Sequence, residues 1–373
     1  MKNVMGIIHH VKNEGNLKEI TRQRCLAAVP FGGRYRLVDF ALSNMVNAGM
    51  RNIGIVTSIN MRSLLDHLGS GREWGLDKKQ EGLFILPAAH AGESKNARKV
   101  DLEDMHVNLD YLKRSRQKFV VVSGSNMVCN IDFKRIFLFH QEMQSDLTLV
   151  YKEDYPFGGD DLEGNVFLET GPGGRVLAVR GRPAVKKRHR VSMDIYLLSK
   201  ELLVQIVEHC AAAGKWDLVK DIIAGSIKEL RVYGYEHRGY LAIINSLGGY
   251  LRRHLELLNP EIWQELFFRH GTIYTKLKDG PPTKYFENSE VRNTLVANGC
   301  KIEGKVENSI LYRGVRIARG AVVKNSVVMP KAEIEEEAVL DGVILDKNVR
   351  VRKGARLLGD QNRPLVVPKN ALV

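Results

Sequence analysis

Two arginines that follow a Gly-Gly pair near the N-terminus are the strongest candidates for contact with an anion. The segment reads PFGGRYR over residues 30–36, so Arg34 and Arg36 lie at the start of an amphipathic helix pattern at 36–48 that Gly49 ends. A guanidinium presents a planar set of donors that matches a phosphate group. These residues therefore predict a phosphate contact, with a structural arginine at a helix start as the alternative.

A second candidate position follows the apolar run FVVV at 119–122, which reads as a buried strand. Strand ends in α/β sheets point at the ligand crevice, so Ser125 is expected there. Its hydroxyl offers this crevice a polar group without charge. His9 and His10 are not expected to form a metal pair, because adjacent residues on a strand point to opposite faces.

The elements around these residues indicate two kinds of fold. The segments at 4–8 and 52–57 are apolar without alternation, as in strands buried on both faces, and helix patterns separate them. They predict a Rossmann-like, doubly wound α/β domain. From about residue 291 the pattern changes, and Val, Ala or Leu recur every six residues from 315 to 357, broken only by Glu333. This hexad repeat predicts a left-handed parallel β-helix. No histidine follows His270, so acyl transfer by the β-helix lacks an imidazole base and an assembly role is preferred.

Composition narrows the class of protein. A chain of 373 residues with 44% hydrophobic and 27% charged residues predicts about two globular domains. The net charge of +13 is spread along the chain. Its densest run, KKRHR at 186–190, predicts a solvated loop, with phosphate contact as the alternative. No nucleic-acid-binding module surrounds this run.

The apolar runs are too short to cross a bilayer, so the protein is expected to be cytoplasmic and not to bind a membrane. Four scattered cysteines are expected to be reduced: Cys25, Cys129, Cys210 and Cys300.

Residues 27–49, together with the order of the two domains, resemble the ADP-glucose pyrophosphorylase (glucose-1-phosphate adenylyltransferase) family over nearly the whole chain. The resemblance implies that several catalytic positions are lost. The family's Gly-Gly-x-Gly-Thr-Arg-Leu loop corresponds to residues 9–17, which begin with two histidines, and its phosphate-binding lysine corresponds to Leu26. Arg24 is either a substitute for that lysine or a surface charge. The two metal-binding aspartates correspond to Ser125 and, with a less certain alignment, to the region of His237.

The resemblance also locates residual sugar-phosphate and effector positions. Arg182 keeps the cation of the family's Glu-Lys-Pro motif, and Ser192 matches a serine of the sugar site, although Asp194 replaces a glycine two residues later. In relatives the cation after the Gly-Gly pair contacts a phosphorylated effector, which gives Arg34 and Arg36 that role. Either of two β-helix arginines, at 350 and 352, is expected to complete the pocket.

Within the family, the chain is most similar to the non-catalytic, D-type regulatory subunit. The resemblance therefore implies glycogen biosynthesis, no cofactor, a lost Mg²⁺ site, a sugar-phosphate effector, and a heterotetramer with a catalytic subunit. The expected domains are a degenerate nucleotidyltransferase domain at 1–255, a linker at 256–290 and a β-helix at 291–373. Two alternatives remain: an active adenylyltransferase with a rewired site, and a β-helix assembly protein without a ligand.

Overall fold

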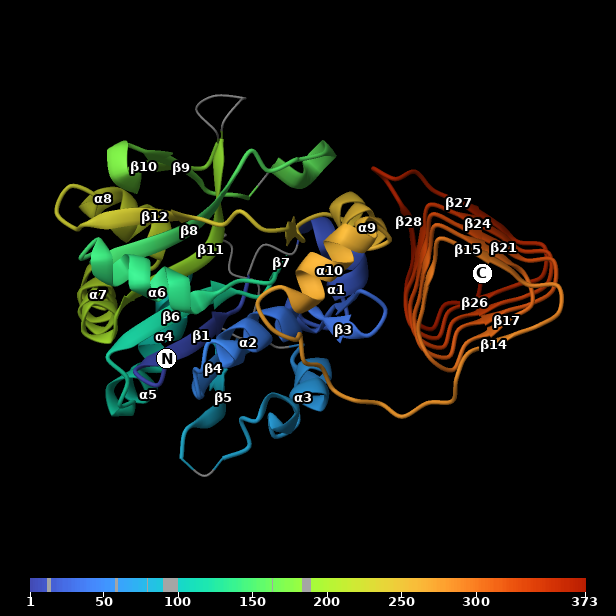
Figure 1. The fold of residues 1–373 in the computed structure, drawn as a ribbon, viewed down its shortest axis with the longest axis horizontal. Helices are drawn as coiled ribbons and strands as arrows, with labels where there is room; N and C mark the ends of the chain where they lie inside the picture. Colours follow the sequence, from blue (N-terminus) through green and yellow to red (C-terminus); the bar gives the residue numbers. More distant parts are fainter. Residues whose placement is uncertain (12–14, 58–59, 79, 90–99, 163, 183–188) are drawn as a thin grey trace.

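The computed structural model describes residues 1–373 apart from 12–14, 58–59, 79, 90–99, 163 and 183–188. Figure 1 shows a sheet flanked by helices beside a triangular coil of short strands seen end-on. The predicted combination of a doubly wound α/β domain and a C-terminal left-handed parallel β-helix is confirmed.

The large sheet has nine strands in the order β10-β9-β11-β6-β1-β4-β5, with β8 beside β11 and β12 beside β8. Strand β1 runs parallel to both β4 and β6, as expected for a doubly wound domain. The strands are β1 (Val4–His9), β4 (Asn52–Thr57), β5 (Gly82–Pro87), β6 (Phe119–Gly124), β8 (Leu147–Glu153), β9 (Phe167–Thr170), β10 (Val176–Arg180), β11 (Arg190–Ser199) and β12 (Val232–Glu236).

Two short antiparallel pairs accompany this sheet, β2 (Pro30–Phe31) with β3 (Tyr35–Arg36), and β7 (Met127–Cys129) with β13 (Leu241–Ile243). The helices are η1 (Gly15–Leu17), α1 (Lys18–Thr21), η2 (Leu26–Ala28), α2 (Leu37–Asn47), α3 (Arg62–Leu68), η3 (Arg72–Trp74), α4 (Leu102–Val107), α5 (Leu109–Arg114), α6 (Phe133–Glu142), η4 (Gly159–Leu162), η5 (Pro172–Gly174), α7 (Lys200–Ala213), the π-helix η6 (Leu218–Ile223), α8 (Ala224–Ser226), α9 (Leu247–Glu256) and α10 (Pro260–Phe268).

The central strands of the sheet are apolar along their whole length because both faces of the sheet are covered. In β6, Val121 belongs to the buried cluster that contains Met45 of α2, whereas Val120 and Val122 belong to the cluster that contains Leu203 of α7. Helix α2 approaches the sheet closely: a Cβ on Gly6 would clash with Sδ of Met45. The sheet is therefore held rigidly between two helical layers, and its strand ends are fixed in space.

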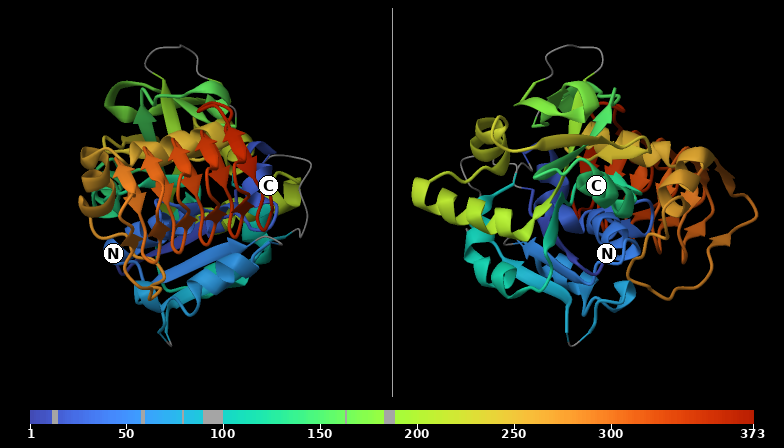
Figure 2. Two further views of the ribbon diagram at one scale, coloured as in Figure 1. Left: turned by 90° about the vertical axis from the view of Figure 1, so that its right-hand side faces the viewer. Right: turned by 60° about the vertical axis from the view of Figure 1, so that its left-hand side comes forward.

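The β-helix consists of three five-stranded parallel sheets, and the left view of Figure 2 shows its stacked coils. Direct pairing of Lys305, Val322 and Val339 gives a coil of 17 residues, one fewer than three hexads. The corner after these strands is tight and left-handed, with φ of 47° at Asn308, 46° at Asn325 and 64° at Gly342. Asn and Gly tolerate this conformation, which explains the shortened coil.

The strands of the β-helix are β14 (Lys284–Tyr285), β15 (Glu290–Arg292), β16 (Leu295–Val296), β17 (Lys301–Ile302), β18 (Lys305–Glu307), β19 (Ile310–Leu311), β20 (Arg316–Ile317), β21 (Val322–Lys324), β22 (Val327–Val328), β23 (Glu333–Ile334), β24 (Val339–Asp341), β25 (Val343–Leu345), β26 (Arg350–Val351), β27 (Arg356–Leu358) and β28 (Leu365–Val367). Strand β14 already pairs with β17, so the span 256–290 contains both helix α10 and the first strand of the β-helix.

The signature segment lies at the junction of the two domains. The Tyr250 hydroxyl of α9 donates to the carbonyl of Pro30, and Nε2 of His254 lies 3.0 Å from the hydroxyl of Tyr312 in the β-helix. One buried cluster joins Phe31 and Phe40 to Ile310 and other β-helix side chains. The Gly-Gly-Arg loop is therefore positioned by both domains.

Candidate functional site

The crevice at the carboxyl ends of β1 and β6 contains a buried histidine–aspartate pair. His9 ends β1 directly beside Gly124 at the end of β6. Nε2 of His9 lies 3.0 Å from Oδ2 of Asp194, and the two side chains are only 1% and 3% exposed. A Cβ on Gly124 would lie 2.6 Å from the same oxygen. The chain's own side chains therefore fill this strand end.

Asp194 adopts a backbone conformation that favours glycine. Its φ is +54°, at an irregularity in the pairing of β11 with β8. The Tyr196 hydroxyl donates to Oδ1 of Asp194 at 3.1 Å, and the Asp194 N–H donates to Oγ of Ser192 at 3.2 Å. Ser192 is buried in this network. A side chain held where glycine is easier, with its carboxylate engaged on both oxygens, indicates that the pair is a specific feature of the site.

Ser125 and His237 are placed at the ends of different strands. His237 directly follows β12, which β11 and β8 separate from β6. Three strand spacings amount to roughly 14 Å. Ile243 of β13 instead lies opposite Met127, two residues after Ser125, and the N–H of Ile244 donates to the carbonyl of Asn126. The residue that reaches the Ser125 end is therefore apolar.

The residues at this strand end do not fit a Mg²⁺ site. Ser125 contributes a neutral hydroxyl, Ile243 contributes no donor, and the carboxylate of Asp194 is engaged by His9 and Tyr196. Mg²⁺ is usually held by one or two carboxylates together with substrate phosphates. Within the described part of the chain, no group of three or more His, Cys, Asp and Glu side chains is arranged to hold a metal ion.

The position of the family's lysine is part of the core. Leu26 is 1% exposed and belongs to a buried cluster with Val128, Ala242 and Ile244. Arg24 is neither a lysine substitute nor a surface charge. It donates to both carboxylate oxygens of Asp346 in the β-helix, at 2.8 and 2.9 Å, and the two side chains are 3% and 4% exposed. Arg24 therefore joins the two domains.

The residual sugar-phosphate residues are not shown together. Arg182 is exposed, and the segment 183–188, which includes the first three residues of the basic run, lies outside the described residues. Of that run, Arg190 forms an ion pair with Glu153 at 3.0 Å and His189 contacts the carbonyl of Tyr155.

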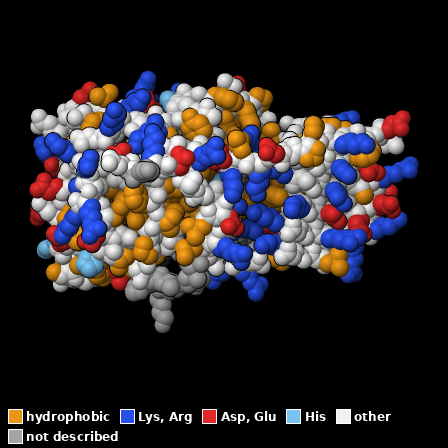
Figure 3. Space-filling model, turned by 90° about the horizontal axis from the view of Figure 1, so that it is seen from below, with side chains coloured by type: hydrophobic (Ala, Val, Ile, Leu, Met, Phe, Trp, Pro, Cys, Tyr) orange, Lys and Arg blue, Asp and Glu red, His pale blue; other side chains and the backbone are white. Residues whose placement is uncertain are grey.

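A cluster of cations lies where the signature loop meets the β-helix, and we call this place the junction cleft. Its cations are Arg34, Arg36, Lys276, Lys278, Arg313, Lys331 and Lys347. Figure 3 shows Lys and Arg side chains gathered at this junction on the underside of the molecule. Burial and the nearby cations Arg36 and Arg24 lower the pKa of Lys347 to about 7. Such mutual repulsion is relieved when an anion binds.

The cleft has a different composition from the predicted one. Arg34 lies over the Tyr35 ring, and Arg36 donates to the carbonyl and hydroxyl of Ser63, so the two signature arginines are held in place. The β-helix contributes Lys347 and Arg313, whereas the predicted Arg350 and Arg352 lie beside Glu335 on an exposed face. Sequence spacing gives no signal for Arg313 or Lys347, because only the docking of the domains brings Arg313 to Arg34 and Lys347 to Arg36.

No helix in the described ranges is long and apolar enough to span a membrane. The Nucleotidyl transferase family matches residues 15–246, and the GlmU-like, C-terminal hexapeptide family matches residues 281–363.

The chain is similar over its length to curated proteins of one biosynthetic group. It is 36% identical to the glycogen biosynthesis protein GlgD of Bacillus subtilis, over 98% of this chain and 96% of that protein. It is 38% identical to GlgD of Geobacillus stearothermophilus, over 86% of this chain and 82% of that protein. It is 28% identical to the glucose-1-phosphate adenylyltransferase of Fervidobacterium nodosum, over 96% and 86% respectively. The chain therefore belongs to the GlgD family of glycogen biosynthesis proteins and carries the nucleotidyl transferase fold.

Proposed function

We propose that this protein serves glycogen biosynthesis as a non-catalytic subunit that regulates or stabilises a catalytic glucose-1-phosphate adenylyltransferase subunit. The observation that carries the proposal is the His9–Asp194 pair, which fills the strand end where a sugar nucleotide would bind. Ser125, Ile243 and Leu26 add a neutral hydroxyl and two apolar groups at positions where phosphoryl transfer needs charge. We infer that the Mg²⁺ site has been lost.

The parts that assembly requires are intact in the same chain. The signature loop, the β-helix and the buried contacts between them form a continuous core. The chain aligns over nearly its whole length with relatives of both the GlgD and the adenylyltransferase type, which supports a mixed oligomer of like-folded subunits, a heterotetramer by the family resemblance. An active transferase with a rewired site would need a solvent-accessible acid, base or metal at the strand end, and the buried pair offers none of these to a substrate.

The purified chain alone is expected to make no ADP-glucose from ATP and glucose-1-phosphate. Loss of a single transition-state donor costs about 10²–10³ in rate, and several are replaced here. A coupled pyrophosphate-release assay measures the activity. Ser125→Asp is expected not to restore it, because Ile243, Leu26 and the His9–Asp194 pair remain. Mg²⁺-dependent turnover by the isolated chain at a rate near that of a catalytic glucose-1-phosphate adenylyltransferase would contradict the proposal.

We further propose that the junction cleft binds a phosphorylated effector of the assembled enzyme. Arg34→Ala is expected to reduce the effector response of the complex at least tenfold, since a charge-assisted contact contributes about 1.5–3 kcal/mol. The matched control is Arg350→Ala, which removes an exposed β-helix arginine outside the cleft. An unchanged effector response in the Arg34 variant, measured as activity against effector concentration, would remove this residue from the site.

Anion binding at the junction cleft is expected to weaken as the pH rises through about 7. Lys347 is charged below its lowered pKa and neutral above it, and only the charged form attracts a phosphate. In the free protein the unfolded chain keeps this proton up to the ordinary lysine pKa, so stability is expected to rise with pH between about 7 and 10. Titration with a sugar bisphosphate at pH 6 and pH 8.5 measures the first effect. Lys347→Met should abolish the pH dependence attributed to this group, and an identical pH profile in that variant would contradict the assignment.

A further inference from the structure

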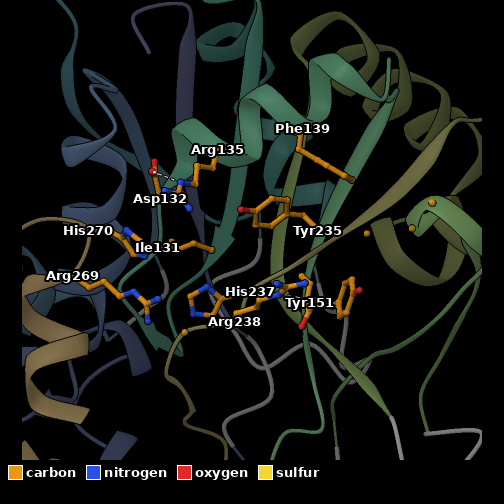
Figure 4. A pocket seen from close by; sticks show the side chains of 15 residues that line it. Ile131, Asp132, Arg135, Phe139, Tyr151, Tyr235, His237, Arg238, Arg269 and His270 are labelled. Carbon is orange, nitrogen blue, oxygen red and sulfur yellow. Dashed lines mark hydrogen bonds and ion pairs between the residues drawn. The ribbon is translucent and has the colours of Figure 1, made fainter. Parts of the chain in front are cut away.

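A second cavity lies away from the strand-end crevice and the junction cleft. Its volume is about 500 Å³, within the range of about 300–1,000 Å³ found for small-ligand sites. It is bordered by the N-terminal half of α6, the end of β12 with its following turn, and the residues after α10, and we call it the α6–β12 cavity. Figure 4 shows its lining, which does not include His9, Ser125 or Asp194.

The arginines of the α6–β12 cavity are paired with carboxylates, and Lys152 beside it donates to the carbonyl of Gly239. Each of its arginines has a carboxylate partner: Arg135 lies 3.6 Å from Asp132, Arg238 lies 3.2 Å from Glu236, and Arg269 lies 2.8 Å from Glu265. An arginine that is already paired has N–H groups left to donate, and its carboxylate has lone pairs left to accept. The walls therefore offer donors and acceptors together, which suits hydroxyl groups better than a phosphate.

His237 adds a buried neutral acceptor to this cavity. The side chain is 5% exposed, and its Nε2 lies 3.2 Å from the carbonyl of Tyr240. A carbonyl only accepts, so Nε2 carries the proton. Burial lowers the pKa of His237 to about 4, which keeps the ring neutral at pH 7 and leaves Nδ1 as an acceptor. A neutral imidazole accepts a hydrogen bond from a hydroxyl and gives no attraction to an anion.

Aromatic side chains complete the wall. Figure 4 shows His270 and Arg269 on one side of the cavity and Tyr235 and Tyr151 on the other. The Tyr235 and Phe139 rings meet edge to face, with centroids 5.4 Å apart, which fixes the Tyr235 ring. The C–H faces of a pyranose pack well on such rings, while its equatorial hydroxyls reach the polar groups at the rim.

We propose that the α6–β12 cavity binds a neutral oligosaccharide of glucose. The balance of paired arginines, a neutral imidazole and aromatic rings gives the class of ligand, a polyhydroxylated compound without charge. The choice of α-1,4-linked glucose rests on the proposed role in glycogen biosynthesis. Binding there would hold the enzyme complex beside glycogen, whose extension uses the ADP-glucose that the complex makes.

Calorimetric titration of the full chain with maltohexaose tests the proposal, with cellohexaose and inorganic phosphate as the comparison ligands. We expect saturable binding of maltohexaose and weaker binding of both others. Tyr235→Leu removes the ring and the hydroxyl while keeping an apolar side chain, and Arg269→Ala removes one paired donor. Each should weaken binding about tenfold. Arg180→Ala is the matched control, because Arg180 is similarly exposed and similarly paired, with Glu169, but lies on β10 outside the cavity.

The melting temperature of each variant shows whether it has folded, and a folded Arg269 variant suffices if the Tyr235 variant does not fold. Absent maltohexaose binding, equal binding by the cavity variants and the control, or tighter binding of phosphate would each overturn the inference. Tighter binding of cellohexaose would overturn the α-linkage, which alone rests on the proposed function. Assembly with a catalytic subunit is measured separately, so the two proposals can fail independently.

Discussion

Arg24→Ala is expected to lower the free energy of unfolding by about 3–5 kcal/mol, because it removes the ion-pair partner of the buried Asp346 carboxylate and leaves it the N–H of Lys347 as a described donor. Arg24 is the only partner that donates to both oxygens of this carboxylate among the described contacts, and Nη1 of Arg24 also reaches the carbonyl of Ile20. Urea unfolding measures the effect, through the midpoint of the transition and through separate signals from the α-helices and from the β-helix. The separation of the two domains is expected before either domain unfolds fully.

The control for this prediction is Arg350→Ala, which breaks an exposed pair with Glu335 and should leave the unfolding midpoint almost unchanged. The double change Arg24→Met with Asp346→Leu should recover most of the loss, since well-packed apolar pairs replace buried ion pairs at little cost. An Arg24→Ala protein that unfolds at the same urea concentration as the control would show that the pair does not hold the domains together.

Replacing His9 and Asp194 together by glycine is expected to reopen the strand-end crevice. The change Asp194→Gly would relieve the positive φ at this position, a gain of about 1 kcal/mol, and removal of both partners leaves no unpaired charge. We expect the double variant to bind ADP-glucose at least tenfold more tightly than the parent chain does, without gaining Mg²⁺-dependent turnover. Titration calorimetry measures the binding.

The single change His9→Gly separates occlusion from general destabilisation. It removes the contact between His9 and Oδ2 of Asp194 while the carboxylate stays buried, so we expect a lower melting temperature and little gain in affinity. Equal affinity of the parent and the double variant for ADP-glucose, with both folded, would show that the buried pair does not close the crevice.

Local sequence patterns were sufficient to predict the elements of the fold. The apolar runs predict β1, β4 and β6. Ser199 and Gly214 are residue types typical of a helix start and a helix end, and they flank α7: the N–H of Leu202 donates to Oγ of Ser199, and Gly214 is left-handed with φ of +66°. The stretch 69–93 is rich in glycine and charged residues and predicts mainly loop, yet it contains β5. The strand is marked by the short apolar run LFIL at 83–86, but it lies at the edge of the sheet, where only Gly82 and Leu86 are buried.

Helical periodicity was less reliable where side chains compete with the backbone. The sequence at 101–110 predicts one helix, but the structure divides it at Asn108, whose side chain donates to the carbonyls of Asp104 and Pro87. The pattern at 216–230 forms the π-helix η6 and a short helix, α8. In both places the periodicity identified a helical segment, but tertiary contacts set its geometry.

The candidate site was partly visible in the sequence. Substitutions at His9, Leu26 and Ser125 stand out against the family resemblance, but a sequence does not show that His9 and Asp194 meet, because they lie on strands far apart along the chain. Ile243 was missed for the same reason: its position opposite Met127 depends on the pairing of β13 with β7. Arg24 could not be assigned because its partner belongs to the other domain.

Co-expression with a catalytic glucose-1-phosphate adenylyltransferase from the same organism tests the central claim most directly. The complex should be purified twice, once with the intact partner and once with a partner whose metal-binding aspartate is replaced by asparagine. We predict co-purification in one particle, altered effector sensitivity with the intact partner, and no activity with the disabled partner, since this chain contributes no chemistry. Two proteins that elute separately and do not affect each other's kinetics, or a disabled complex that still makes ADP-glucose, would contradict the proposed role.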